Sequence, residues 1–169
     1  MRGTVPAACL LLAMAGTATG HDLDCVAGYC VGRPFAPDEA EGAWQVADWP
    51  DPASCSQVSG GSLPAGIGMM LLDGRIARFE IGLSGGDEAT PPLAPFGLRR
   101  GMSLAEAGAR MPAGGLDLDL HKYAWPPGLY LTWRDATRDR ALRAELPDAR
   151  IEAILWGRVD AVQSSEGCA

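Results

Sequence analysis

The sequence predicts an α+β protein that consists mainly of antiparallel sheet with one well-formed helix. Three observations support this fold class: a hairpin pattern over residues 68–81, a capped helix pattern over residues 101–112, and a series of short apolar segments after that helix. Short apolar segments separated by turn residues are typical of antiparallel sheets, because antiparallel strands need only tight connections. Strands on both sides of a single helix, without strict strand–helix alternation, indicate the α+β class.

The first part of the chain after residue 20 contains few signs of regular structure. Residues 21–42 are rich in Gly, Pro and Asp, which favours an irregular conformation. Residues 44–47 fit one short strand. Pro50 and Pro52 would end this strand, because proline cannot donate a hydrogen bond to a neighbouring strand.

The clearest local signal is the dipeptide Asp73-Gly74 between the apolar runs 68–72 and 75–81. A two-residue type I′ turn needs positive φ at both central residues, and Asp-Gly is a preferred pair for such a turn. The pattern therefore predicts a β-hairpin. Arg78 and Glu80 lie on one face of its second strand, and we expect this face to be exposed to solvent.

A helix is predicted between Gly101 and Pro112. Ser103 is the expected N-cap, and Glu106 stands three residues later, as in a capping box; Pro112 ends the helix. Its apolar face consists of Leu104, Ala107 and Met111. Further strands are expected over residues 116–120, 129–133, 141–146 and 151–156.

Two segments share one pattern, which favours an internal repeat. Residues 73–82 and 148–157 both begin with Asp-x-Arg-Ile and end with apolar-x-apolar-Gly. Two unrelated hairpins could also share this pattern. In the repeat interpretation, a single α+β domain over residues 21–169 contains pseudo-halves at about 21–82 and 97–169, and the first half is a degenerate copy that has lost most of its helix.

The first twenty residues have the pattern of a secretory signal peptide. Arg2 gives a basic start, an Ala- and Leu-rich run covers residues 5–15, and Ala18 and Gly20 place small residues before a cleavage site. The apolar run is shorter than the ~20 residues that a membrane span needs, so we expect no membrane span. Cleavage after Gly20 would release a periplasmic or secreted protein.

The net charge limits the classes of partner. The chain contains 21 acidic and 14 basic residues, which gives a formal net charge of −7. An acidic surface repels nucleic-acid phosphates and anionic lipid headgroups. We therefore expect neither nucleic acid nor an anionic membrane as a partner.

The cysteines predict disulfides. Of the five cysteines, Cys9 lies in the signal segment, and the other four remain after cleavage. An even number of cysteines in an exported chain favours two disulfides. A zinc site is the alternative, but the spacings fit no zinc template. We expect the pairs Cys25–Cys30 and Cys55–Cys168, although three pairings are possible in principle.

The helix segment resembles part of a known repeat unit. Gly101-Met102-Ser103, followed by Ala105-Glu106-Ala107, Pro112 and antiparallel strands, is similar to the unit of the BamE/SmpA lipoproteins and of the beta-lactamase inhibitor proteins. The resemblance implies a helix packed on a small sheet, with two units in tandem forming one concave sheet. Pro34 and Pro37 stand where the helix of the first unit would lie.

Residues 55–169 resemble more closely an uncharacterised family of exported bacterial proteins. The matching stretches are residues 97–103, 121–123, 130–132 and parts of 157–168. This resemblance implies no activity and no catalytic residue. We expect no cofactor and no metal.

The two histidines support one alternative, a copper enzyme. After cleavage His21 would be the N-terminal residue, and its amine and ring nitrogen could bind copper together with His121. This arrangement resembles that of secreted copper oxygenases that cleave polysaccharides, but no further motif of those enzymes is present. An envelope hydrolase or copper enzyme using His21 and His121 therefore stays an alternative.

Residues 121–130 are the best candidate for a contact loop, because aromatic residues gather there around Pro126-Pro127-Gly128. The expected binding residues are His121, Lys122, Tyr123 and Trp125, an aromatic and basic patch on an acidic protein. Tyr130 and Trp133 are instead expected to belong to a strand and to pack in the core.

Asp117 and Asp119 alternate with leucines on a predicted strand, so the two carboxylates share one face. Paired carboxylates could serve acid–base chemistry or bind calcium. A solvent-exposed strand face is the simpler explanation, and no Ser-His-Asp or Cys-His set accompanies them.

The lack of a catalytic set favours a non-catalytic binding or inhibitor-like module. Its partner would be an unknown protein or a cell-envelope glycan. A carbohydrate-binding protein is a further alternative.

Overall fold

The computed structural model describes residues 23–37, 42–48, 54–82, 94–125, 128–165 and 167–168. These residues have the predicted α+β fold, with one eight-stranded antiparallel sheet in the strand order β3-β4-β5-β6-β10-β9-β8-β7. Its strands are β3 (Trp44–Asp48), β4 (Cys55–Gly60), β5 (Ile67–Leu72), β6 (Arg75–Ile81), β7 (Leu116–Leu120), β8 (Leu129–Asp135), β9 (Arg140–Leu146) and β10 (Ala153–Arg158). The other elements are a small hairpin of β1 (Cys25–Val26) and β2 (Tyr29–Cys30), the 3-10 turn η2 (Pro95–Gly97), and the helices α1 (Leu104–Arg110) and α2 (Val159–Gln163).

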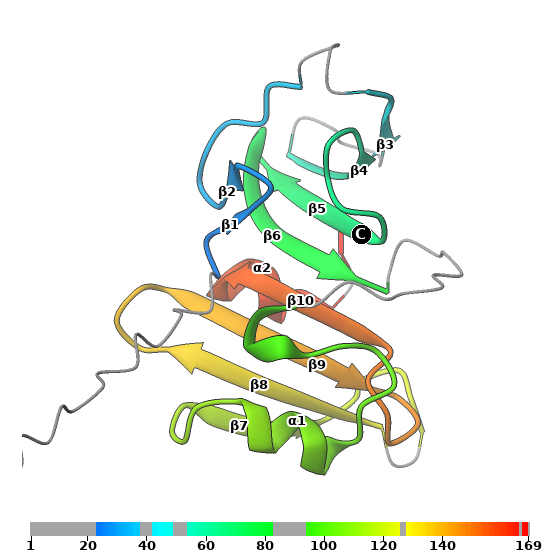
Figure 1. The fold of residues 1–169 in the computed structure, drawn as a ribbon, viewed down its shortest axis with the longest axis vertical. Coiled ribbons are helices and arrows are strands. Elements are labelled where there is room, and N and C mark those ends of the chain that lie inside the picture. Colours follow the sequence, from blue (N-terminus) through cyan, green and yellow to red (C-terminus); the bar gives the residue numbers. More distant parts are fainter. Residues whose placement is uncertain are drawn as a thin grey trace, which may run out of the picture.

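The large sheet consists of two four-stranded meanders that meet at its centre (Figure 1). Strands β3 to β6 form the first meander, β7 to β10 form the second, and β6 pairs with β10. In this pairing Ile81 lies opposite Ile154, and Phe79 lies opposite Trp156. In the pattern shared by residues 73–82 and 148–157, Phe79 corresponds to Ile154 and Ile81 corresponds to Trp156. Each of these residues therefore pairs with the counterpart of the other. This register is the one expected of two equivalent halves, while the tandem duplication itself stays a prediction.

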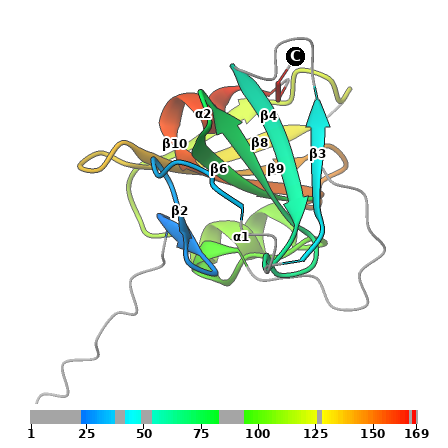
Figure 2. The ribbon, with the colours of Figure 1, turned by 90° about the horizontal axis from the view of Figure 1, so that it is seen from above.

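The main hydrophobic core lies on the face of the sheet that α1 and the β1–β2 hairpin cover (Figure 2). Phe79 and Trp156 from the central strands are fully buried there, and their rings lie 5.7 Å apart. Ala107 of α1 and Leu23 of the N-terminal segment pack into the same cluster. Removal of this apolar surface from water is the main source of stability.

The opposite face of the central strands is covered by α2 and the C-terminal tail. Ala161 and Cys168 pack there together with Met70 of β5. Val162 packs with Leu155 of β10 in a neighbouring cluster. Both faces of the sheet are therefore buried at its centre.

The expectation that Arg78 and Glu80 face solvent is wrong. Each side chain is only 1% exposed, because α2 and the tail cover this face of β6. Arg78 donates from Nε and Nη2 to Oε2 of Glu80, at 3.2 and 3.1 Å. Its Nη1 donates to the carbonyl oxygens of Ala161 and Ser164, at 2.7 and 2.8 Å. Because the last carbonyl groups of a helix have no partner within the helix, Arg78 supplies the missing donor for α2.

The predicted hairpin turn and helix cap are both confirmed. Asp73 and Gly74 have φ angles of 50° and 68°, as the type I′ turn requires. The hydroxyl of Ser103 accepts the N–H of Glu106, and the carboxylate of Glu106 accepts the N–H of Ser103 at 2.8 Å. These reciprocal bonds satisfy two backbone donors that the first turn of α1 leaves free.

Some predicted boundaries change, and some elements are additional. Strand β10 begins at Ala153 rather than at residue 151, because Ile151 instead exchanges backbone hydrogen bonds with Gly101 and Met102, each at 2.8 Å. Strand β4 and helix α2 are not indicated by the sequence pattern, and β1 and β2 replace part of the expected irregular segment. No α-helix lies in the described residues 23–37, 42–48 and 54–82.

The described residues form two disulfides, Cys25–Cys30 and Cys55–Cys168, in the pairing that the sequence favours. The first closes the β1–β2 hairpin. The second ties the C-terminal tail to the start of β4 in the first meander. Disulfides are typical of proteins in oxidising compartments. No helix in the described ranges combines the length and the apolar character needed to cross a bilayer.

Candidate functional site

The contact loop, defined as residues 121–125, follows β7 directly at the edge of the sheet. The N–H of His121 donates to the carbonyl oxygen of Gly128, at 2.9 Å, and thereby closes the connection to β8. The imidazole of His121 lies inside the turn, where its Nδ1 accepts the N–H groups of Tyr123 at 3.2 Å and Ala124 at 3.1 Å. Three hydrogen bonds made by one residue therefore hold the backbone of this loop.

Tyr130 of β8 forms the base on which the contact loop rests. Its ring stacks on the His121 ring with 4.3 Å between centroids, and the guanidinium carbon of Arg143 lies 4.6 Å from its centroid. Its hydroxyl oxygen accepts the N–H of Lys122 at 3.4 Å. Tyr130 is buried, as predicted, and Trp133 packs against the core with its ring 5.1 Å from that of Phe96.

Titratable groups of the contact loop and of β9 meet beside Tyr130. Nε2 of His121 lies 3.9 Å from Oε2 of Glu145 on β9. Burial lowers the pKa of His121, and the nearby charge of Arg143 lowers it further. Burial raises the pKa of Glu145, although Arg143 and Arg78 partly oppose this. Because Nδ1 accepts two N–H groups, the neutral His121 ring carries its proton on Nε2, which faces Glu145.

These contacts have a direct consequence for the copper alternative. The one lone pair of the neutral His121 ring is already used inside the loop, so this arrangement offers no free ring nitrogen to a metal. His21 lies outside the described residues. Within the described ranges, no group of three or more His, Cys, Asp or Glu side chains is placed to hold a metal ion.

The tip of the contact loop is open to solvent. Trp125 is 92% exposed and Tyr123 is 62% exposed, and Lys122 is exposed as well. The expected exposure of the two aromatic side chains is therefore confirmed. The predicted stiff turn involves Pro126 and Pro127, which lie outside the described residues.

Gly128 explains how the loop closes so tightly. A Cβ atom at this position would lie 2.6 Å from Cβ of Ala124 and 2.9 Å from Cβ of His121. These distances are shorter than van der Waals contact, so a larger residue would force the two sides of the loop apart. Gly128 thus permits the close approach that His121 then fixes by hydrogen bonds.

Strand β7 next to the loop has two distinct faces. Asp117 and Asp119 share one face and are both exposed, as expected of a solvated strand face, and Asp117 forms an ion pair with Arg134 of β8. The other face consists of Leu116, Leu118 and Leu120, of which Leu118 is 54% and Leu120 is 76% exposed. The sequence pattern identifies the alternation, but it does not show that β7 is the edge of the sheet.

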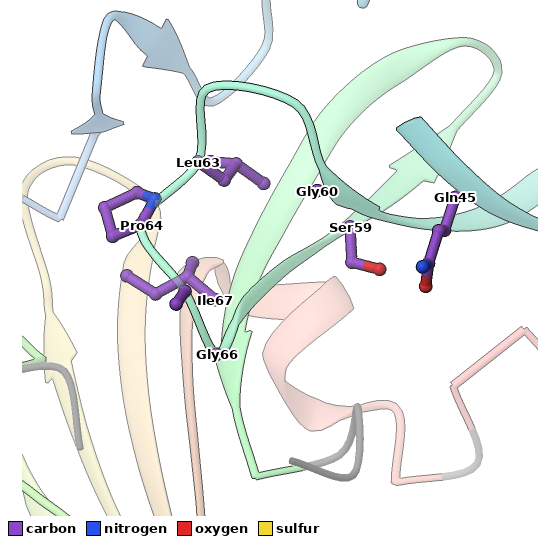
Figure 3. A pocket seen from close by; sticks show the side chains of 8 residues that line it. Gln45, Ser59, Gly60, Leu63, Pro64, Gly66 and Ile67 are labelled. Atoms are coloured by element: carbon purple, nitrogen blue, oxygen red, sulfur yellow. The ribbon is translucent and has the colours of Figure 1, made fainter. Parts of the chain in front are cut away.

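A separate shallow pocket of about 180 Å³ lies in the first meander, at the connection between β4 and β5 (Figure 3). Leu63, Pro64 and Ile67 supply its apolar part, and Gln45 and Ser59 supply its polar part. No titratable side chain lines this pocket, so its walls provide no group for acid–base chemistry.

Comparison of the chain with protein-family models, with curated proteins and with solved structures found no match in any of the three. The function is therefore inferred from the geometry of the described residues.

Proposed function

We propose that the mature protein is a non-catalytic binding module of the periplasm or the cell exterior, which binds its partner through the contact loop. Lys122, Tyr123 and Trp125 make the contact, and His121 holds their backbone in place. The observation that carries this proposal is the nearly complete exposure of the Trp125 ring on a loop whose backbone is held from within.

The physical support for this function is preorganisation. A loop that is already ordered loses little conformational entropy when it binds, so more of the contact energy appears as affinity. Exposed Trp and Tyr side chains offer large apolar surfaces with polar edges, and such residues are frequent among those that dominate binding energy. The partner is a protein or a cell-envelope glycan.

The first prediction concerns the two exposed aromatic residues. We expect Trp125→Ala and Tyr123→Ala each to weaken binding of the mature protein to envelope fractions by roughly tenfold or more, because each removes a contact side chain of the kind that costs over ~1.4 kcal/mol at an interface. Retention should be measured in parallel on periplasmic proteins and on purified cell-wall material, which separates a protein partner from a glycan.

Val46→Ala is the matched control, because Val46 is an exposed apolar residue in β3 at the other edge of the sheet. It should bind like the unaltered protein. If Val46→Ala and Trp125→Ala lose binding equally, general surface hydrophobicity rather than the contact loop is responsible. If neither Trp125→Ala nor Tyr123→Ala weakens binding to either fraction, the proposed function is wrong.

The second prediction concerns export. We infer that residues 1–20 are removed as a signal peptide, which is supported by the leader pattern and by the two disulfides. Intact mass spectrometry of the envelope fraction should find a chain that starts at His21 with both disulfides formed. A full-length chain in the cytoplasm would contradict this inference.

A further inference from the structure

Strand β7 is the last strand of the large sheet and pairs on one side only, with β8. The carbonyl of Gly115 accepts the N–H of Arg134, and the N–H of His121 donates to the carbonyl of Gly128. In an antiparallel ladder, residues that bond to the neighbouring strand alternate with residues whose N–H and C=O point away from it. Asp117 and Asp119 lie two and four residues after Gly115, so their backbone N–H and C=O groups also bond to β8.

The backbone groups of the alternate residues, Leu116, Leu118 and Leu120, point to the open side of the sheet. Among the described residues, no strand pairs with this side. An unpaired strand edge is a template for another strand. Here the edge also carries exposed leucines on one face and carboxylates on the other, and it leads directly into the contact loop.

The side chains indicate which strand would fit. Antiparallel pairing places residues directly opposite one another on the same face, where apolar pairs and opposite charges stabilise and like charges destabilise. A partner strand should therefore set apolar residues opposite the leucines and basic residues opposite Asp117 and Asp119. The formal net charge of −7 on the whole chain favours the same choice.

A second copy of this chain fits the edge poorly. In a symmetric antiparallel pairing centred on Leu118, Asp117 of one copy would lie opposite Asp119 of the other, twice. Pairings centred on either aspartate would place that aspartate opposite its own copy. Each register that forms more than one leucine pair thus opposes like charges.

We propose that β7 binds its partner by strand addition, and that the added segment is a protein strand in which apolar and basic residues alternate. This inference rests on the proposed binding function and specifies its partner class and docking mode. Backbone hydrogen bonds to Leu116, Leu118 and Leu120 supply part of the affinity, and the two faces of β7 supply the selectivity. The contact loop lies at the end of the added strand.

The test uses the mature, disulfide-bonded protein and three capped peptides. The first is Thr-Lys-Val-Arg-Val-Lys-Thr, the second is the acidic counterpart Thr-Glu-Val-Glu-Val-Glu-Thr, and the third, Lys-Arg-Lys-Thr-Val-Val-Thr, has the composition of the first without its alternation. Amide hydrogen exchange is measured residue by residue. With the first peptide, exchange at Leu116, Leu118 and Leu120 should slow at least tenfold, while Asp117 and Asp119 change little.

One variant separates strand addition from simple charge attraction. Leu118→Pro removes an N–H that points to the open edge, and proline is tolerated at such edge positions. It should weaken binding of the first peptide roughly tenfold or more. Leu118→Thr, which keeps the N–H, is the matched control and should retain most of the binding. Circular dichroism establishes that both variants fold.

Four results would overturn the inference. The first is equal slowing of amide exchange at the three leucines by all three peptides, and the second is no slowing by the first peptide. The third is equal binding of the first peptide to Leu118→Pro and to the unaltered protein. The fourth is slow exchange at the three leucines without any peptide, in a protein that is a dimer. The last result would make a second copy the occupant. If Trp125→Ala loses envelope binding while the first peptide has no effect, the proposed function stands and strand addition at β7 does not.

Discussion

Replacing Arg78 with alanine is expected to lower the free energy of unfolding by about 3–5 kcal/mol, the range typical for removal of one partner from a buried ion pair. The variant leaves the carboxylate of Glu80 buried without its counter-ion. It also removes the donor for the carbonyl groups of Ala161 and Ser164, which fixes α2 and the tail on the sheet. Urea denaturation of the mature protein measures the change.

The pH dependence of this effect identifies its cause. Burial raises the pKa of Glu80 above its ordinary value of 4.5, and the charge and hydrogen bond of Arg78 only partly oppose this. Without Arg78 the folded-state pKa rises further. A raised folded-state pKa favours folding below the unfolded-state pKa, and this advantage is lost as the pH rises through the folded-state pKa. The deficit of Arg78→Ala should therefore be larger at pH 8 than at pH 5.

A double-mutant cycle with Glu80→Gln is the control for this prediction. If the unpaired carboxylate dominates, Arg78→Ala should cost clearly less in the Glu80→Gln background than in the unaltered protein. An equal cost in both backgrounds would mean that the lost bonds to the tail, rather than the buried carboxylate, account for the effect.

Loss of the Cys55–Cys168 disulfide should have the second large effect. The bond joins residues 113 positions apart, so in the chain-entropy model it destabilises the unfolded state by about 4.8 kcal/mol. Its loss would also free the tail, which carries the Ser164 carbonyl that Arg78 binds. We expect Cys55→Ser with Cys168→Ser to lower the free energy of unfolding by about this amount in urea denaturation.

The Cys25–Cys30 bond provides the internal comparison. It spans only 5 positions, for which the same model gives about 2 kcal/mol. Removal of Cys25 and Cys30 should therefore be the milder change. Equal losses for the two double variants would show that loop length does not decide the stability provided by these bonds.

The parts of the fold that the sequence predicts depend on local chemistry. The Asp73-Gly74 turn and the Ser103–Glu106 capping box each follow from a few neighbouring residues, and both are present. Ile76 and Ala77 are adjacent apolar residues and so break the strict alternation of β6; the register between β5 and β6 shifts at this point, between Met70 and Leu71.

The parts that the sequence does not indicate depend on contacts between distant segments. Strand β4 has a Ser- and Gly-containing sequence that resembles a loop, and it becomes a strand because β3 and β5 pair on either side of it. From the sequence, Arg78 and Glu80 resemble surface residues. They are buried because the C-terminal tail covers them, and Ser164 of this tail lies 86 positions after Arg78.

The candidate site also has features that local sequence predicts and features that depend on the three-dimensional structure. The aromatic and basic composition of residues 121–125 predicts a contact loop with exposed aromatic side chains; the exposure of Tyr123 and Trp125 is confirmed, while binding by the loop stays a prediction. The role of His121 as the acceptor that orders this loop depends on the turn geometry, which its sequence neighbours do not reveal. The open edge of β7 depends on the order of all eight strands, which no local pattern encodes.

The central claim is that Trp125 belongs to a contact surface and not to the packed core. The most direct test measures unfolding and envelope binding on the same preparation of the Trp125→Ala protein. We predict a free energy of unfolding within about 1 kcal/mol of that of the unaltered protein, as for a surface substitution, together with a clear loss of binding. A Trp125→Ala protein that unfolds, or that stays folded and binds undiminished, would contradict the claim.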